Sequence, residues 1–520
     1  MTFKETKIYQ IILFSVAIMM IVMGVLIFIT PPSIFPDPSW GFQVMRSMQM
    51  GGKFNMIPSP DPADISKNIS SFLSWWSPGQ YLTPYFFKTI TGLNTGRAAA
   101  LTVILGNLSG LAGFYFFFKK AGFSKIVVAV SLLFILIQQA FWVPYAYYNG
   151  GEILLFAFEG WFLLGCISFN KVDVRLLIFI LCSGWIGFFC KSSFMWIYAS
   201  GLLCLWIRLS KGESNWFGWI KKGIWLAVPA ILSLAVVYLV YLSKGENPAS
   251  ASGGFKLAFE ALGFPLASPL LAGFSVDDML NGLIFSSDPQ QFTYTQTVLI
   301  LVTLAILSVL LIVMLLRYIP HNNYRLFIIV FYTVSILFFG YSFLKQAAIS
   351  YESRHFRTMG LLIVPGVIYL VSRSKLPYQV GFIIICGAIA YKSSKYMAMI
   401  NRVNQNGAHG ITGLSQQFID QPSLNYMLSL DQQKTNAVFV FTSADIGLEI
   451  QHHRIITLDP YDKNTEQNIS PYNGHAGTIY LVLPSSYKST EVAVMFKYFP
   501  GYKDFVPTRL SKNYVLYTAQ

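Results

Sequence analysis

Residues 8–29 read IYQIILFSVAIMMIVMGVLIFI, a run in which no side chain carries a charge. An α-helix needs about 20 predominantly apolar residues to cross the hydrocarbon core of a bilayer. The run therefore predicts a membrane-spanning helix. It is too long for the apolar part of a signal peptide and no small-residue cleavage site follows it, so we expect an uncleaved helix.

Further apolar runs of spanning length predict about eleven membrane-spanning helices in all. Together with the first run they lie at 8–29, 98–118, 126–143, 151–169, 175–190, 193–208, 224–242, 297–316, 326–344, 358–372 and 378–395. Of the 520 residues, 54% are hydrophobic and only 12% are charged, against roughly 25% charged in a soluble domain. This composition excludes a soluble enzyme, a nucleic-acid-binding protein and a disordered scaffold. The predicted fold class is a polytopic α-helical membrane protein.

The formal net charge of +14 is explained by membrane topology. Counted over alternate short loops, fifteen Lys and Arg residues fall on one predicted side and four on the other. Because cytoplasmic loops carry the excess of basic residues, the N-terminus is predicted to be cytoplasmic. Residues 401–520 contain nine acidic and nine basic residues and are predicted to lie outside.

The long segments predicted on the outer side are the loops 30–97 and 243–296 and the tail 401–520. Loops of such length are usually functional. Apolar patches in both loops, such as residues 72–76 and 264–266, predict short helices at the membrane surface. In the tail, β-rich runs follow a predicted helix at 411–429, and they lie at 437–441, 478–482 and 514–517. We therefore predict a membrane domain over 1–400 and a small α/β domain over 401–520.

Asp37 is the candidate catalytic residue. It opens a predicted helix that ends at Gly51-Gly52, with Pro38 at a position that favours the first helical turn. Helix capping alone accounts for an aspartate there. A carboxylate just outside the first span could also act as a general base, because capping does not exclude catalysis.

Four basic residues predicted on the outer side are candidates for binding a phosphate: Lys191, Arg354, His355 and Arg357. Lys191 interrupts an apolar run, and charges within membrane bundles usually mark a site. The alternative is that these residues only anchor helix ends at the membrane surface.

A further group of residues could contact a sugar or an acceptor. Aromatic rings can stack on a sugar, and carboxylates can accept hydrogen bonds from its hydroxyl groups. This group consists of Trp40, Asp61, Asp64, Trp76, Tyr81, Tyr148 and Glu152. Asp61 and Asp64 lie in a turn-rich stretch where plain solvation is the simpler interpretation, and Glu152 could equally favour the N-terminus of its helix.

No metal site, cofactor or nucleic-acid partner is expected. The five cysteines all lie in apolar runs and form no metal-ligand spacing. His452 and His453 are adjacent on a predicted strand and would point to opposite faces, so we expect surface histidines there. A divalent cation is compatible with the sequence but is not indicated by it.

The motifs on the predicted outer side resemble those of the GT-C glycosyltransferase superfamily. That superfamily includes protein O-mannosyltransferases, aminoarabinose transferases and phage-type O-antigen glucosyltransferases. The resemblance rests on Asp37 with Trp40 before Gly51-Gly52, on the stretches 76–81 and 92–97, on Gly187 to Lys191, and on residues 351–356. Pro38 stands where many members have a second acid, and the His of the family's His-Pro-Pro stretch is missing.

The resemblance implies an inverting transferase with a polyprenyl-phosphate sugar donor and a glycan or lipid-linked acceptor. It implies Asp37 as the base and the basic group 191, 354, 355 and 357 as the donor phosphate site. We expect an O-antigen or another surface polysaccharide as acceptor, with lipid A or a protein as the runner-up, and a location in the bacterial inner membrane. A polysaccharide polymerase or O-antigen ligase and a lipid-linked substrate flippase are the alternatives.

Overall fold

The computed structural model describes residues 3–520 except 35, 75, 246–252, 281, 283–291, 418, 434 and 463. Contacts divide the chain into two compact units. The first unit comprises residues 1–24, 104–144 and 151–398, and the second comprises 25–103, 145–150 and 399–520. The tail therefore shares a unit with the first predicted outer loop, and the predicted boundary at residue 400 falls inside the helix Leu376–Asn406.

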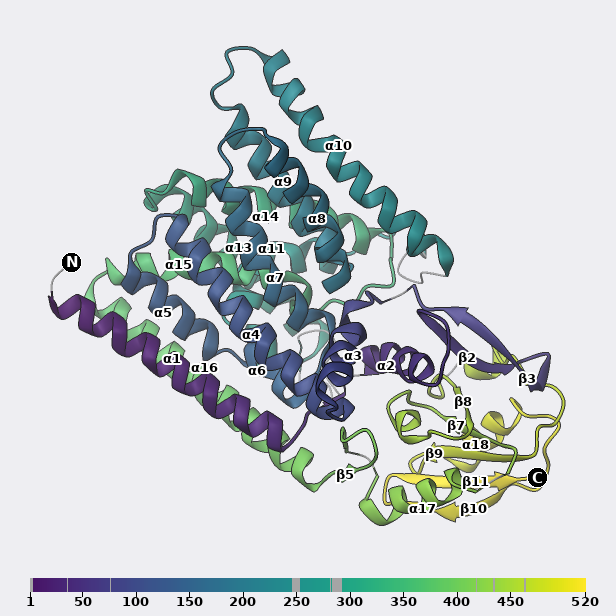
Figure 1. Ribbon diagram of the computed structural model, residues 1–520. Coiled ribbons are helices and arrows are strands. Elements are labelled where there is room, and N and C mark those ends of the chain that lie inside the picture. Colours follow the sequence, from purple (N-terminus) through teal and green to yellow (C-terminus); the bar gives the residue numbers. More distant parts are fainter. Residues whose placement is uncertain are drawn as a thin grey trace. The chain divides into compact units, whose positions relative to one another are not determined.

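The first unit is built from helices (Figure 1). They are α1 (Phe3–Ile29), α4 (Thr95–Lys120), α5 (Lys125–Leu136), α6 (Gln139–Ala146), α7 (Gly151–Ser168), α8 (Val174–Cys190), α9 (Phe194–Ser210), α10 (Trp216–Val240), α11 (Phe259–Gly273), α12 (Val276–Met279), α13 (Tyr294–Tyr318), α14 (Asn322–Leu344), α15 (Arg357–Ser372) and α16 (Leu376–Asn406). Two short 3₁₀ helices are η1 (Leu242–Lys244) and η3 (Ser353–Phe356). The ends of α1, α4, α6 and α16 continue into the second unit.

The protein is a multi-pass membrane protein. Within the described residues, 8 helices are long and apolar enough to cross a membrane, and α5 with α6 forms a further pair bent by 49°. The apolar helices α8 and α9 have 17 residues each and fall just short of that length. Each of the predicted runs coincides with one of these helices or with the bent pair, while the number of crossings stays a prediction.

Helix α11 corrects one expectation about the second long loop. The patch around Phe264 was predicted to lie at the membrane surface, yet Phe264 is fully buried. The helix packs against α13, α14 and α15. A Cβ on Gly360 of α15 would lie 2.6 Å from the carbonyl carbon of Ala272, so a glycine is needed for this close approach. This close approach lets α11 pack within the bundle.

The second unit contains the first predicted outer loop. It consists of β1 (Ser33–Ile34), α2 (Pro36–Gln49), the antiparallel hairpin of β2 (Met56–Asp61) and β3 (Asp64–Phe72), and α3 (Gly79–Thr91). Strand β1 pairs in parallel with β4 (Tyr147–Tyr148). The helix predicted from Asp37 is α2. The surface helix predicted at 72–76 is wrong among the described residues, because β3 runs to Phe72 and α3 begins only at Gly79.

The tail forms a five-stranded mixed sheet in the order β10-β11-β9-β7-β8. The strands are β7 (Ala437–Phe441), β8 (Arg454–Thr457), β9 (Thr478–Pro484), β10 (Val506–Arg509) and β11 (Tyr514–Ala519), with helices α17 (Gln421–Asp431) and α18 (Ser489–Phe496). The shorter elements are β5 (Ala408–His409), β6 (Ser415–Gln416), η4 (Ile446–Glu449) and η5 (Thr465–Gln467). The β-rich runs were predicted correctly. The helix predicted at 411–429 is wrong at its start, because Asp420 caps α17 by accepting the Ser423 N–H.

Both faces of the sheet are covered by apolar residues. On β7, Phe439 and Phe441 belong to the cluster with Met427 of α17, whereas Val438 and Val440 belong to the cluster with Met495 of α18. This alternation follows from the two-residue period of a strand. Because both faces are covered, the central strands are continuous apolar runs, which is why the sequence revealed them.

Candidate functional site

A buried carboxylate, Glu152, holds two of the predicted phosphate-binding cations in the first unit. The Lys191 Nζ lies 2.5 Å from Glu152 Oε1, and the Arg354 Nη1 lies 3.6 Å from the same oxygen. The side chains of Glu152, Lys191 and Arg354 are 12%, 16% and 30% exposed. Residues separated by up to 202 positions in the sequence thus meet at one oxygen atom. We call Glu152, Lys191 and Arg354 the Glu152 cluster.

The backbone explains why Lys191 reaches Glu152. Lys191 ends α8 in an extended conformation, and its N–H donates to the Gly187 carbonyl at 2.9 Å. Glu152 lies in the first turn of α7, directly after Gly151. A Cβ on Gly151 would lie 3.1 Å from the Cys190 carbonyl oxygen and 3.2 Å from the Lys191 Cγ. The absent side chain therefore lets the start of α7 lie against the end of α8.

Arg354 is held from two further sides. Its Nε lies 2.5 Å from the Glu352 Oε2. The 3₁₀ turn that carries it is fixed by Asp277, whose carboxylate accepts the Ser353 N–H at 3.1 Å. Asp277 precedes Asp278, whose pKa is raised to about 6 by burial and by the charge of Asp277. The sequence did not indicate these aspartates as site residues, since their distance from Arg354 in the chain gives no local signal.

The other two predicted phosphate ligands are arranged differently. His355 lies beside the Glu152 cluster, and its Nε2 is 3.4 Å from the Ser350 Oγ. Arg357 begins α15, and its guanidinium carbon lies 5.3 Å from the centre of the Phe156 ring. Thr358 donates to the buried carboxylate of Glu159 at 2.6 Å. Arg357 thus lies over the ring of Phe156, whereas the ion pairs with Glu152 are made by Lys191 and Arg354.

Asp37 and Trp40 lie in the second unit, near the start of α2, and both are half-buried. Trp76 is half-buried in the segment before α3. Asp61 and Asp64 flank the turn of the β2–β3 hairpin. They accept the backbone N–H groups of Ala63 and Ser66, which is the arrangement of turn residues. The interpretation as turn residues accounts for both aspartates.

Tyr81 and Tyr148 were predicted to contact a sugar, and their burial contradicts this. Both are fully buried in the second unit. The Tyr81 hydroxyl donates to the Asn55 side chain, and the Tyr148 hydroxyl donates to the Gln80 carbonyl at 2.6 Å. The ring of Tyr148 packs edge-on against Phe42 at 5.3 Å. These rings have no face left for a ligand, so their role is structural.

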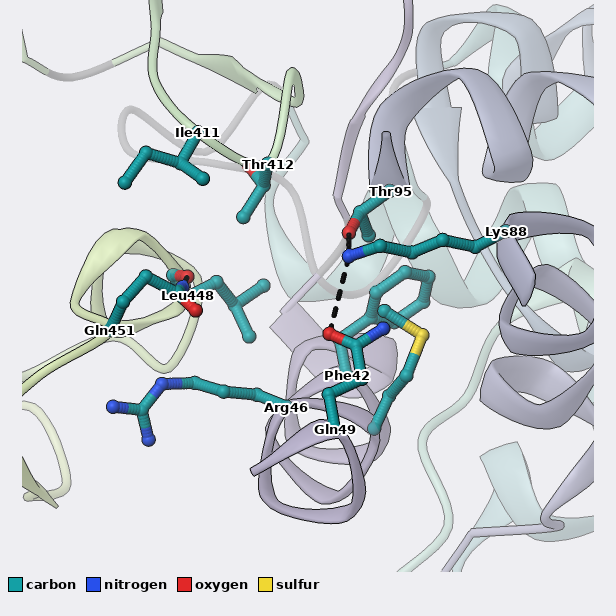
Figure 2. A pocket seen from close by; sticks show the side chains of 10 residues that line it. Phe42, Arg46, Gln49, Lys88, Thr95, Ile411, Thr412, Leu448 and Gln451 are labelled. Atoms are coloured by element: carbon teal, nitrogen blue, oxygen red, sulfur yellow. Dashed lines mark hydrogen bonds between the residues drawn. The ribbon is translucent and has the colours of Figure 1, made fainter. Parts of the chain in front are cut away.

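The second unit also contains a small pocket, lined by both polar and apolar side chains, that the sequence did not reveal (Figure 2). Its cavity has a volume of about 40 Å³. Lys88 Nζ donates to the Gln49 Oε1 at 3.2 Å and to the Thr95 Oγ1 at 3.1 Å. Arg46 donates to the carbonyls of Ile450 at 2.5 Å and His453 at 3.1 Å.

Burial lowers the pKa of Arg46 to about 10 and also lowers the pKa of Lys88. Arg46 follows Asp37 by nine residues, which corresponds to about 2.5 helical turns. The two side chains therefore leave α2 on opposite faces, and the pocket is separate from the surroundings of Asp37. The donors of Arg46 serve the backbone of the tail, which favours a structural role for this residue.

No group of three or more His, Cys, Asp or Glu side chains suited to a metal ion occurs in the part of the chain that the structure describes. His453 corrects another expectation, because it is buried and its Nδ1 lies 3.0 Å from Asp431 Oδ1. His452 is exposed, as predicted.

The complete arrangement resembles solved membrane glycosyltransferases. The chain aligns with ArnT from Cupriavidus metallidurans bound to undecaprenyl phosphate, with a TM-score of 0.51 and 11% sequence identity over 97% of this chain and 98% of that chain. The apo state of the same protein gives a TM-score of 0.50 and 12% identity over 98% of this chain and 97% of that chain. The chain has the GT-C fold. This confirms the fold that the motifs predicted.

A third structure, the arabinofuranosyltransferase AftD from Mycobacteria, is similar with a TM-score of 0.47 and 13% identity over 97% of this chain and 41% of that chain. No protein-family model and no curated protein sequence matches the chain. At such low identity the GT-C fold is preserved in the arrangement of the elements rather than in the sequence. The site must therefore be argued from this chain's own residues.

Proposed function

We propose that the protein is a glycosyltransferase that moves a sugar from a polyprenyl-phosphate donor to an acceptor glycan. The observation that carries the proposal is the Glu152 cluster within a GT-C fold. The ArnT structure of the same fold is bound to undecaprenyl phosphate. Two cations on one largely buried carboxylate are suited to a phosphate that gains charge as it departs.

In the proposed reaction, an acceptor hydroxyl attacks the anomeric carbon of the donor sugar. The new carbon–oxygen bond forms as the bond from that carbon to the phosphate oxygen breaks, with inversion of configuration. Asp37 takes the hydroxyl proton, and polyprenyl phosphate leaves with the bonding electron pair. No redox cofactor is required by this balance, and a divalent cation is not part of the proposal.

Lys191 and Arg354 would bind the departing phosphate. An ammonium group has three N–H donors and a guanidinium has five, so each can hold Glu152 and a phosphate oxygen together. Arg354 can grip two phosphate oxygens at once. His355, beside the cluster, would orient the phosphate, whereas Arg357 would act through the packing at Phe156.

The finer assignments also belong to the proposal. We propose an O-antigen or another surface polysaccharide as the acceptor, and a site on the outer face of a bacterial inner membrane. The N-terminus would then be cytoplasmic and the tail periplasmic. The support is the uneven distribution of Lys and Arg over alternate loops.

The test uses purified protein, a panel of polyprenyl-phosphate sugars and a surface polysaccharide acceptor. Release of polyprenyl phosphate that depends on the acceptor is expected. Asp37→Asn should abolish release, because the amide keeps the oxygen at the start of α2 but cannot accept the proton. Asp61→Asn, at the hairpin turn, is the matched control and should retain the wild-type rate. Unimpaired release by folded Asp37→Asn protein would remove Asp37 from the mechanism, and transbilayer movement without release would instead support a flippase.

A further inference from the structure

A large cavity lies at one end of the helices α8, α9 and α10, far along the chain from Asp37 and Arg354. Its volume is about 620 Å³. It is open to the surface and is lined by the loop between α7 and α8, which contributes Lys171, and by the first turns of α10, which contribute Lys221, Lys222 and Trp225. Helices α8, α9 and α10 pack against one another within the first unit (Figure 1).

The surroundings of the cavity are strongly basic. Residues 170–177 and 208–225 contain six basic side chains, Lys171, Arg175, Arg208, Lys211, Lys221 and Lys222, but only two acidic ones, Asp173 and Glu213. Asp173 caps α8 by accepting the Leu176 N–H at 3.0 Å. Glu213 lies 2.6 Å from the Lys222 Nζ. The acids are thus engaged within the protein, and a net positive charge remains around the opening.

Hydrogen bonds join the segments that line the cavity. Arg208 Nη1 donates to the Cys166 carbonyl at 2.5 Å, and its Nη2 donates to the Asn170 Oδ1 at 3.3 Å. Lys222 Nζ also donates to the Leu209 carbonyl at 2.5 Å. These bonds tie the loop between α7 and α8 and the start of α10 to the end of α9. Lys171, whose side chain is 82% exposed and whose Nζ lies 3.9 Å from the Asp173 Oδ2, and the exposed Lys221 lie at the opening.

The rim next to these lysines is apolar and aromatic. Trp216, Phe217 and Trp225 at the start of α10 are exposed, as are Val174 and Ile178 on α8. Residues 216–244 form one of the candidate membrane spans. Indole rings favour the boundary between headgroups and hydrocarbon. A soluble anion would use the lysines but not this apolar rim, whereas a phospholipid uses both.

We propose that this cavity binds the headgroup of an anionic phospholipid from the surrounding bilayer. The phosphate lies between Lys171 and Lys221, and the acyl chains follow the exposed apolar residues of α8 and α10. Basic pockets between membrane helices are suited to such headgroups, because each nearby lysine strengthens attraction to an anionic lipid. The proposal does not depend on the transferase activity.

The experiment titrates the full-length protein in detergent with phosphatidylglycerol or phosphatidylcholine and counts bound lipids by native mass spectrometry. Tighter binding of phosphatidylglycerol is expected. Lys171→Gln should weaken it about fivefold, and Lys171→Gln with Lys221→Gln about 30-fold. The matched control is Lys119→Gln with Lys120→Gln at the end of α4, two exposed lysines whose loss changes the net charge equally. This control should bind as the wild type does.

Three outcomes would overturn the proposal. They are equal affinity for the two lipids, equal weakening in both double variants, and displacement of the lipid by free glycerol phosphate at equal concentration. The last would indicate a site for a soluble anion. Because Lys171 is so exposed, the Lys171→Gln variant should fold normally. This single variant keeps the test decisive if the double variant is unstable.

Discussion

Two buried carboxylates, one in each unit, show how differently the same chemical group can be used. Glu152 in the first unit is surrounded by the side-chain cations Lys191 and Arg354. Asp431 in the second unit accepts the backbone N–H groups of residues 451, 452 and 453 and lies 3.0 Å from the His453 Nδ1. The Asp431 side chain is only 1% exposed.

The difference lies in what the partners can still do. Backbone N–H groups are fixed by the chain, so Asp431 can serve only to hold the segment after η4 against α17. Lys191 and Arg354 have long side chains that keep part of their surface exposed. Such cations can turn toward an incoming phosphate. A carboxylate held by backbone donors therefore belongs to the scaffold, and one held by partly exposed cations is a candidate for function.

The largest effects that this comparison predicts are losses of activity on substitution of Lys191 or Arg354. Arg354→Lys and Lys191→Ala should each lower kcat roughly ten- to a thousand-fold, as expected for the loss of one group that stabilises developing charge. Arg354→Lys keeps the charge but loses the two-pronged contact with phosphate. Steady-state release of polyprenyl phosphate measures both variants, because a loss of transition-state contacts appears in kcat beyond any change in KM.

Lys119→Ala is the control for these substitutions, since it removes an exposed lysine at the end of α4 and should leave kcat unchanged. If Lys191→Ala and Arg354→Lys both turn over at the wild-type rate, the phosphate is held elsewhere and the Glu152 cluster is structural, like Asp431.

At Asp431 the expected loss is in stability rather than in activity. Asp431→Asn should destabilise the fold around the sheet by about 3 kcal/mol, because the amide nitrogen cannot accept the hydrogen bonds that the buried carboxylate accepts from the backbone and its donors are left unsatisfied. Hydrogen exchange of peptides covering β7 and β9 in the full chain should accelerate accordingly. Asp459→Asn, at an exposed residue, should change the exchange by less than about 0.5 kcal/mol. Unchanged exchange in Asp431→Asn would show that this pair contributes little.

The fold was predictable where the signal is local. The spanning runs need only their own apolar residues, and β7 and β9 are apolar on both faces. The sequence did not reveal the hairpin β2–β3, because Pro58 and Pro60 interrupt the strand pattern. The hairpin is stabilised by the pairing of its two strands, which only the structure shows. Strand β10 was missed for a related reason, since its residues are exposed and its stability comes from pairing with β11.

The sequence indicated candidate residues for the site but not how they pair. The charge of Lys191 within an apolar run and the basic stretch at 354–357 pointed to Lys191 and Arg354, which the structure brings together at Glu152, while their role as phosphate ligands stays a prediction. Nothing in the sequence indicated that Glu152 would be their shared partner, because the contact joins α7, the end of α8 and η3. Tyr81 and Tyr148 were assigned wrongly for the same reason, since an aromatic residue in a loop can equally stack on a ligand or fill the core.

The smallest predicted effect concerns a third carboxylate, Glu449, whose contribution to stability depends on pH. Burial raises the pKa of Glu449, although hydrogen bonds from Thr412 oppose the shift. A raised pKa means that folding favours the protonated acid, so the stabilising contribution is complete below the usual value of about 4.5 and is lost as the pH rises through the folded value. The exchange protection of β7, corrected for the intrinsic rate, should therefore be higher at pH 5 than at pH 7. Glu449→Gln should reduce this difference by less than about fivefold, because a neutral amide does not titrate. An unchanged pH dependence in Glu449→Gln would show that Glu449 is not the group that titrates.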